Sequence, residues 1–202
     1  MTPYSALALQ MDCHAVNGLA DRAAVEQAMS NTLDRVDQLI AGSKGFIGTF
    51  SGDTLRLVVL PEYFLTSFPM GESIPEWRTK ACIEMDGPEY QRMGEIARNR
   101  GVYLSGNAYE IDPHFPDLYF QTSFIISDDG EVILRYRRLI SMFAPTPHDV
   151  LSQYRDVYGD EGLFPVVDTP LGRLACVASE EILYPEVARA LATRGAEVIL
   201  HS

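Results

Sequence analysis

The sequence predicts a layered α/β domain, in which helices cover a mixed sheet. Short apolar runs, typical of buried strands, alternate along the chain with segments of helical periodicity. One pair of β-rich runs is joined by an Asp-Gly turn, which indicates an antiparallel hairpin. The chain has 202 residues, 47% of them hydrophobic, so it can bury a sizeable core as a single domain over residues 1–202.

The first part of the chain is predicted to form a strand, a helix and a second strand. Residues 4–11 are largely apolar and give the first strand. A helix follows, because apolar residues recur at spacings of three and four, and Gly42 and Gly45 are expected to end it. The helix residues are Val25, Met29, Leu33, Val36 and Ile40. Residues 56–60 then predict a strand buried on both faces, which ends just before Glu62.

The middle of the chain repeats this order and adds the hairpin. Pro88 opens a second helix, and Gly101 closes it before a strand at residues 102–106. Residues 118–126 and 131–136 are β-rich, and the Ser-Asp-Asp-Gly sequence between them tolerates the positive φ of a tight turn. These two strands are therefore predicted to be antiparallel.

The last part is predicted to contain a long loop followed by strand, helix and strand. Residues 140–164 have little periodicity, and a loop of that length in a compact domain is more often functional than idle. The apolar run after Gly172-Arg173 indicates a buried strand, and Pro185 suits the start of a helix that Gly195 ends. Residues 197–200 begin a final strand.

Ser179 lies between this buried strand and Pro185, at a predicted strand-to-helix elbow. Such an elbow projects a side chain out of a sheet towards substrate, and in many hydrolases it carries the nucleophile. The alternative interpretation is an ordinary turn that contains a serine.

Composition excludes several classes of partner. A formal net charge of −12 argues against nucleic acid and against an anionic membrane surface. The three cysteines, Cys13, Cys82 and Cys176, are widely spaced and odd in number, which favours neither a disulfide framework nor a metal cluster. The N-terminus lacks a signal-peptide pattern, and no apolar run approaches the ~20 residues that span a bilayer. We therefore expect a cytoplasmic protein with no membrane partner.

No cofactor or metal is expected, because the glycine-rich phosphate loops, His-Glu-x-x-His and paired Cys-x-x-Cys motifs are all missing from the sequence. The histidines are isolated: His14, His114, His148 and His201. His148 beside Asp149 in the long loop is the one candidate for a functional role, and a surface histidine is the alternative.

Three segments together resemble the nitrilase, or carbon–nitrogen hydrolase, superfamily. They are Leu-Pro-Glu-Tyr-Phe-Leu-Thr-Ser at 60–67, Gly-Glu-Val-Ile-Leu-Arg-Tyr-Arg-Arg at 130–138, and residues 169–186 from Thr-Pro-Leu-Gly-Arg to Tyr-Pro-Glu. They occur in the order and spacing of that family, and residues 194–200 are similar to it as well. The resemblance covers nearly the whole chain from Ala6. It implies an α-β-β-α sandwich that usually pairs with a second subunit through helices, so we expect a homo-oligomer, a dimer or higher.

The resemblance also implies three catalytic positions. In the family a glutamate acts as general base, a lysine stabilises the tetrahedral intermediate, and a cysteine attacks the amide or nitrile carbon. Glu62 matches the first position, Arg138 stands at the lysine position, and Ser179 stands at the cysteine position. Cys176 is not a substitute for the nucleophile. It lies three residues earlier, on the opposite face of a strand, where a buried core cysteine is expected.

Two acids follow the expected nucleophile. Glu180 stands where the family usually has an aromatic residue, and Glu181 keeps the acid commonly found there. Both are candidate substrate-binding residues. The arginine at position 138 is able to pair bidentately with Glu62, which would lower the basicity of that carboxylate.

The predicted function is hydrolysis of a small non-peptide amide or nitrile, with Ser179 in place of the usual cysteine nucleophile. The alternative is a catalytically inactive pseudoenzyme that acts as a ligand-binding or structural subunit, since two of the three catalytic positions differ from the family. Compared with the family, the domain is expected to lack the C-terminal portion after residues 197–200, which a partner chain would then complete.

Overall fold

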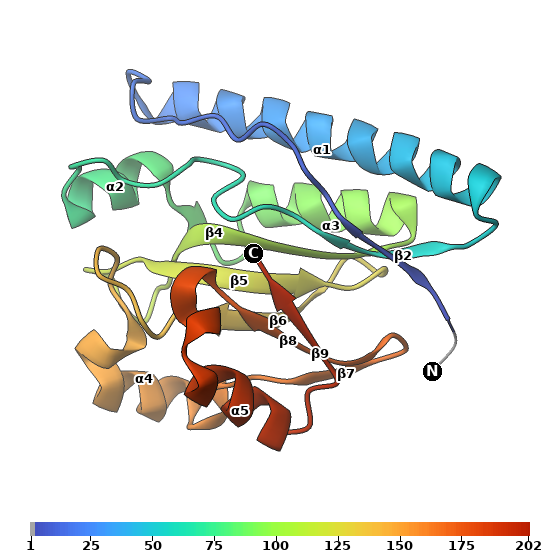
Figure 1. Ribbon diagram of the computed structural model, residues 1–202. Coiled ribbons are helices and arrows are strands. Elements are labelled where there is room, and N and C mark those ends of the chain that lie inside the picture. The colour runs from blue at the N-terminus through green and yellow to red at the C-terminus, as the bar shows by residue number, and fades with distance from the viewer. Residues whose placement is uncertain (1–2) are drawn as a thin grey trace.

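The computed structural model describes residues 3–202 and contains two sheets packed face to face between layers of helices (Figure 1). This arrangement confirms the layered α/β fold and gives it the α-β-β-α order. The elements, with η for short 3₁₀ helices, are β1 (Ser5–Ala8), α1 (Arg22–Phe50), β2 (Leu55–Val59), α2 (Ile74–Ala81), β3 (Ile83–Glu84), α3 (Pro88–Arg100), β4 (Tyr103–Ile111), β5 (Phe120–Ile126), β6 (Val132–Arg137), η1 (Pro147–Val150), α4 (Leu151–Tyr158), η2 (Glu161–Leu163), β7 (Val167–Thr169), β8 (Gly172–Val177), η3 (Ser179–Leu183), α5 (Pro185–Thr193) and β9 (Val198–His201).

The larger sheet brings one end of several strands to a common edge. Its strand order is β1-β2-β4-β5-β6, with β3 also paired to β4. Strands β1, β2 and β4 are parallel, whereas β5 is antiparallel to both β4 and β6. The carboxyl ends of β2 and β6 and the first residues of β5 therefore lie at the same edge. Residues that follow β2 and β6 can meet there.

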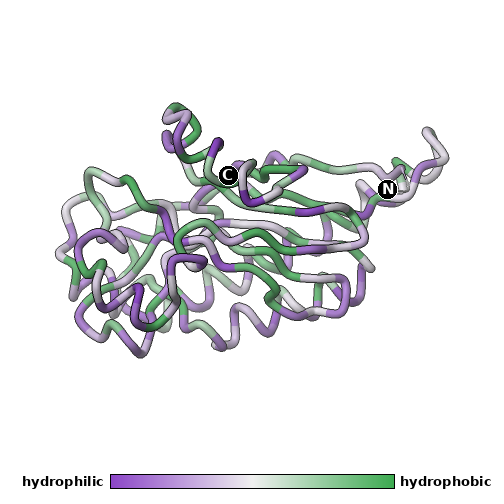
Figure 2. Tube along the Cα trace, turned by 90° about the horizontal axis from the view of Figure 1, so that it is seen from below, coloured by the Kyte–Doolittle hydropathy of each residue, from purple (hydrophilic) through white to green (hydrophobic). Residues whose placement is uncertain are grey.

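The smaller sheet, β7-β8-β9, separates two apolar layers. Along β8, Leu174 and Cys176 pack towards the larger sheet, while Ala175 and Val177 pack towards Leu191 of α5. This alternation is the period of two expected for a strand buried on both faces. A third layer of core joins the larger sheet to α1 and α3. Figure 2 shows hydrophobic stretches running along the strands. Among residues 3–202, no helix is both long and apolar enough to cross a membrane.

Helix α1 continues beyond the end that was predicted from its glycines. Asp21 caps its start by accepting a hydrogen bond from the Ala24 N–H at 2.9 Å. The helix runs through Gly42 and Gly45, because a glycine inside a helix costs only about 1 kcal/mol and Ile47 in the extra turns packs against the core. It ends where Gly52 adopts a φ of 73°. The predicted stop at residues 42–45 was wrong.

The second predicted helix and the hairpin are confirmed. Helix α3 begins at Pro88 and ends at Gly101, which has the left-handed φ of 60°. Strands β5 and β6 are antiparallel, and Gly130 in the turn between them has a φ of 86°. A Cβ added to Gly94 of α3 would come within 2.4 Å of the Gly130 carbonyl oxygen, so two glycines permit the helix to touch the turn.

Residues 140–164 contain regular structure that was not expected from their weak periodicity. Helix α4 forms within this segment, next to the short helices η1 and η2. The Asp149 carboxylate accepts a hydrogen bond from the Thr146 N–H at 2.7 Å and starts the helical segment. Tyr154 of α4 then packs in an aromatic cluster with Phe115 and Phe120. Tyr158, one helical turn further along, packs against the same cluster, so tertiary contacts fix this helix.

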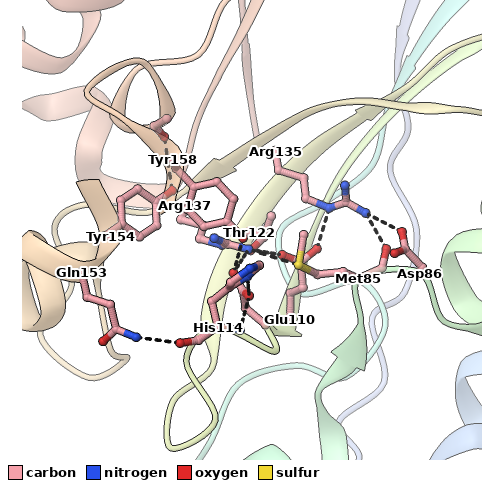
Figure 3. Close-up of polar contacts among 12 residues, drawn as sticks. Met85, Asp86, Glu110, His114, Thr122, Arg135, Arg137, Gln153, Tyr154 and Tyr158 are labelled. Atoms are coloured by element: carbon pink, nitrogen blue, oxygen red, sulfur yellow. Dashed lines mark hydrogen bonds and ion pairs between the residues drawn. The ribbon is translucent and has the colours of Figure 1, made fainter. Parts of the chain in front are cut away.

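A buried group of charged side chains ties α4 to the larger sheet (Figure 3). Arg137 is 2% exposed and forms ion pairs with Asp112 at 2.7 Å and with Glu110 at 3.2 Å. Its guanidinium also lies over the Tyr158 ring, 4.7 Å from the centroid. The Tyr158 hydroxyl donates to Asp112 at 2.5 Å. The segment after β6 is therefore anchored by charges that have little contact with solvent.

Candidate active site

The predicted catalytic residues come from three loops at one edge of the sandwich. Glu62 lies in the turn after β2, and Arg138 directly follows β6, whose carboxyl end shares an edge with that of β2. Ser179 follows β8, and its neighbour Glu180 forms an ion pair with Arg138. The structure thus places the three loops together.

Glu62 is held by a neighbouring amide more closely than by the arginine. Gln121 Nε2 donates to Glu62 Oε1 at 2.6 Å, whereas Arg138 Nη1 is 3.9 Å from the same oxygen. The Glu62 side chain keeps 23% of its surface exposed. Burial, together with the Glu62 charge, raises the pKa of the adjacent Tyr63 to about 12. Tyr63 therefore stays protonated and donates to Gln121 Oε1 at 3.1 Å.

Arg138 is almost entirely enclosed by hydrogen-bond acceptors. Its side chain is 6% exposed, and its Nε donates to the Ile140 carbonyl oxygen at 2.7 Å. Its Nη1 donates to Gln121 Oε1 at 2.7 Å and to the Tyr63 hydroxyl at 3.2 Å. Its Nη2 forms the ion pair with Glu180. Arg138 and Glu62 do not form the bidentate ion pair that the sequence allowed.

Ser179 occupies a strained turn. Its φ is 52°, a left-handed value that is uncommon for a residue other than glycine. The end of β9 fixes this geometry, because the Ser179 N–H donates to the Ser202 carbonyl oxygen at 3.0 Å and His201 Nε2 donates to the Ser179 carbonyl oxygen at 2.8 Å. Strained backbone of this kind is found where a functional side chain must be presented.

The two acids after Ser179 have different environments. Glu180 is 38% exposed; burial opposes its ionisation, but a hydrogen bond from Ser179 and the charge of Arg138 lower its pKa overall. Glu181 is fully buried, and burial raises its pKa. Its carboxylate accepts hydrogen bonds from the Tyr136 hydroxyl at 2.8 Å and the Leu139 N–H at 2.7 Å. Glu181 thus faces the interior and joins the elbow to the residues around Arg138.

Two residues of the site were missed in the sequence. Gln121 joins Glu62 to Arg138, and its only signal is a polar side chain at the start of the apolar run 120–126. His201 contacts Ser179, and the pairing of β8 with β9, which aligns Val177 with His201, brings it there. Neither residue belongs to one of the three matching segments. In residues 3–202, no group of three or more His, Cys, Asp and Glu side chains is placed to hold a metal ion.

Cys176 is a core residue, as expected from its place three residues before Ser179. It is fully buried between the two sheets, where its sulfur lies 3.9 Å from the Ser105 hydroxyl oxygen. Burial raises the pKa of its thiol to about 12. A thiol in this position is protonated at neutral pH and is a poor nucleophile.

Thiol labelling provides a test of this assignment. At neutral pH, iodoacetamide is expected to modify Cys13, which is exposed, and to leave the buried Cys82 and Cys176 unmodified in the folded protein. Peptide mass spectrometry checks the sites, and labelling in denaturant provides the control in which all three react. Rapid modification of Cys176 in the folded protein would contradict its placement in the core.

The fold and the site together define a class of protein. The structure combines an α-β-β-α sandwich with a strained elbow residue, a carboxylate and a buried cation at one edge. Residues 10–202 match the carbon-nitrogen hydrolase family, and the chain belongs to this family.

The sequence relatives of the chain include amidases. The chain is 32% identical over 148 residues to a deaminated glutathione amidase of Yersinia enterocolitica, and this match covers 72% of the chain and 50% of the relative. It is 29% identical over 200 residues to a formamidase of Bacillus thuringiensis (strain Al Hakam), with 98% of this chain and 53% of the relative covered. The chain therefore spans about half the length of these curated relatives.

Solved structures share the fold at lower identity. Saccharomyces cerevisiae Nit3, a member of branch 10 of the nitrilase superfamily, superposes with a TM-score of 0.61 at 21% identity, covering 86% of this chain and 58% of Nit3. An amidase from Nesterenkonia sp. AN1 gives a TM-score of 0.60 at 22% identity, with 86% of this chain and 58% of the amidase covered. These likenesses confirm the fold class.

Proposed function

We propose that this protein hydrolyses the carbon–nitrogen bond of a small non-peptide amide or nitrile, with Ser179 as nucleophile. The observation that carries the proposal is the strained φ of 52° at Ser179, in an elbow whose next residue contacts Arg138. Glu62 is assigned as the base, and Arg138 as the electrostatic partner. Activity in the cytoplasm and assembly with a second copy of the chain are part of the same proposal.

In the first step, Glu62 takes the proton of the Ser179 hydroxyl as the oxygen attacks the amide carbon. A serine needs such a base, because its hydroxyl is a weak nucleophile at neutral pH. The carbonyl electrons move to oxygen, and the negative charge that develops is stabilised by the positive charge of Arg138. Four of the five N–H groups of Arg138 already have partners, which leaves one on Nη2 for this oxygen.

In the second step, the protonated Glu62 gives its proton to the leaving nitrogen, and the carbon–nitrogen bond breaks. The acyl group remains on Ser179 as an ester, and ammonia or an amine departs. Glu62 then takes a proton from water, whose oxygen attacks the ester carbon. Cleavage of the carbon–oxygen bond releases the carboxylic acid and returns the proton to Ser179, so the protein is unchanged after one turnover.

The relatives support a small substrate and a covalent route. Formamidase and deaminated glutathione amidase are named for amide substrates. In one structure of a mutant of the Nesterenkonia amidase, the acetamide moiety of fluoroacetamide is added covalently at the active-site cysteine. Ser179 stands at the position where the family has that cysteine.

A pseudoenzyme is a second candidate function, and the enclosure of Arg138 favours it. A guanidinium with four engaged N–H groups has less freedom to follow a developing oxyanion than a lysine at the same position. Serine in place of cysteine adds to the loss, because a hydroxyl depends more strongly on its base. Under this alternative, the site binds a small amide without turning it over.

Ammonia release from a panel of small amides and nitriles tests the proposal. The protein is expected to release ammonia from at least one of them, and Glu62→Gln is expected to lower kcat by roughly 10² to 10⁴-fold, because the proton acceptor is lost. Glu161→Gln is the matched control, since it removes the same charge from an exposed residue of η2. It should leave the rate unchanged.

Two outcomes of this assay distinguish the candidates. Unchanged turnover in Glu62→Gln would remove the assigned base. Turnover that appears only when Arg138→Lys and Ser179→Cys are combined would favour the pseudoenzyme. Such a result would mean that the unchanged protein keeps a site able to bind the amide but lacks the lysine and cysteine needed to hydrolyse it.

A further inference from the structure

The two residues that depart from the family beside the nucleophile contact each other. Arg138 stands where the family has lysine, and Glu180 stands where it usually has an aromatic residue. In the structure, Arg138 Nη2 forms a close ion pair with Glu180 Oε1. The carboxylate of Glu180 therefore provides the counter-charge for the guanidinium of Arg138.

Arg138 has a choice of two carboxylates, and it pairs closely with only one. Glu180 takes its Nη2, whereas the nearest approach to Glu62 is 3.9 Å, from Nη1. That distance is longer than a hydrogen bond. Gln121 lies at both groups, since it donates to Glu62 at 2.6 Å and accepts from Arg138 at 2.7 Å. The amide thus bridges the guanidinium and the Glu62 carboxylate.

The alternative pairing would be harmful to a base. An arginine fork matches a carboxylate bidentately, and this geometry is among the strongest charge-assisted hydrogen bonds in proteins. A Glu62 carboxylate held in that way would have both oxygens occupied. It would accept the proton of Ser179 poorly. The ammonium of a lysine is a point charge without a fork, so the family residue does not present this conflict.

We propose that Glu180 is a positioning residue that holds Arg138 away from Glu62 and so leaves the Glu62 carboxylate available to take the proton of Ser179. The role of Glu62 as a base rests on the proposed function. The placement of Arg138 by Glu180 does not. Glu180 is needed because the cation is an arginine. We expect replacement of Glu180 to have little effect on catalysis when residue 138 is a lysine.

A double-variant cycle with two readouts tests this proposal. The set is the unchanged protein, Glu180→Gln, Arg138→Lys and the combination of both. The first readout is the crystal structure of Glu180→Gln. Without the Glu180 charge, a guanidinium nitrogen is expected within about 3 Å of a Glu62 oxygen, compared with 3.9 Å in the unchanged protein.

The second readout is the pH profile of kcat/KM for the best amide of the panel. Glu180→Gln is expected to move the acid limb to lower pH by about one unit, because the nearer guanidinium favours the ionised base, and to lower the plateau roughly tenfold, because that base is weaker. In the Arg138→Lys background, the same change is expected to alter kcat/KM by less than about threefold. Loss of the Glu180 charge alone would shift the profile equally in both backgrounds, whereas a positioning role shifts it only when residue 138 is arginine.

Glu186→Gln is the matched control, because it removes the same charge from an exposed residue in the first turn of α5. It should move neither readout. An Arg138 that stays in place in the Glu180→Gln crystal structure would overturn the proposal, as would an unmoved acid limb. If the guanidinium moves to Glu62 and no variant turns over any amide, the positioning role stands and the proposed hydrolysis fails.

Discussion

Replacement of Ser179 by alanine is expected to lower kcat by roughly 10⁶-fold, because the change removes the atom that forms the acyl bond. The methyl group leaves the elbow intact. Its conformation is fixed by backbone contacts to Ser202 and His201 that alanine preserves. Alanine and serine are also similarly strained at a φ of 52°. Ammonia release with the best substrate of the panel measures the effect.

Two further variants make this result specific. Ser152→Ala removes a hydroxyl from an exposed position of α4 and should leave kcat unchanged. Ser179→Cys supplies a stronger nucleophile at the same place and should retain turnover. Equal rates for the Ser179→Ala variant and the unchanged protein would exclude Ser179 as the nucleophile.

Arg137→Met is expected to lower the free energy of unfolding by about 3 to 5 kcal/mol, because it leaves buried carboxylates without their counter-charge. Asp112 and Glu110 are both buried, with 1% and 0% of their surface exposed. Arg135 still pairs with Glu110 at 3.0 Å, so Asp112 is the carboxylate that the loss of the Arg137 charge destabilises most. The α4 segment is expected to loosen first, since Tyr158 donates to that same carboxylate. Urea unfolding followed by circular dichroism measures the change.

Arg92→Met provides the matched control for the buried network. Arg92 pairs with Asp34 and Glu95 on the surface, with 39% of its side chain exposed. Exposed ion pairs typically contribute less than about 1 kcal/mol. A loss in Arg137→Met no larger than that in Arg92→Met would show that the buried network does not hold the fold together.

Elements with a strong local signal were predictable from the sequence. Pro88, Gly101 and the Asp-Gly turn at Gly130 each impose a backbone conformation, and the structure has the helix start, the helix end and the hairpin at those positions. The end of α1 was not predictable, because Ile47 packs against a core that only the assembled fold provides. Helix α4 was missed for the same reason, since Tyr154 finds its partners in Phe115 and Phe120.

In the candidate site, too, some residues could be predicted from the sequence and others depend on the assembled fold. Glu62, Arg138 and Ser179 were predicted because each lies in a segment that resembles the family, and the structure brings their loops together. Gln121 and His201 could not be found in this way, because their contacts depend on strand register and on the meeting of separate loops. The contact of Arg138 with Glu180 likewise required the position of η3 relative to β6.

The most direct test of the account is to find the acyl group during turnover. The protein is mixed with its best amide, quenched in acid within one turnover, and digested for peptide mass spectrometry. The account predicts that the peptide containing Ser179 gains the mass of the acyl group, and that the gain is absent from Ser179→Ala. Turnover accompanied by an acyl group on Cys13 or Cys176, or on no residue, would contradict the assignment of Ser179 as the nucleophile.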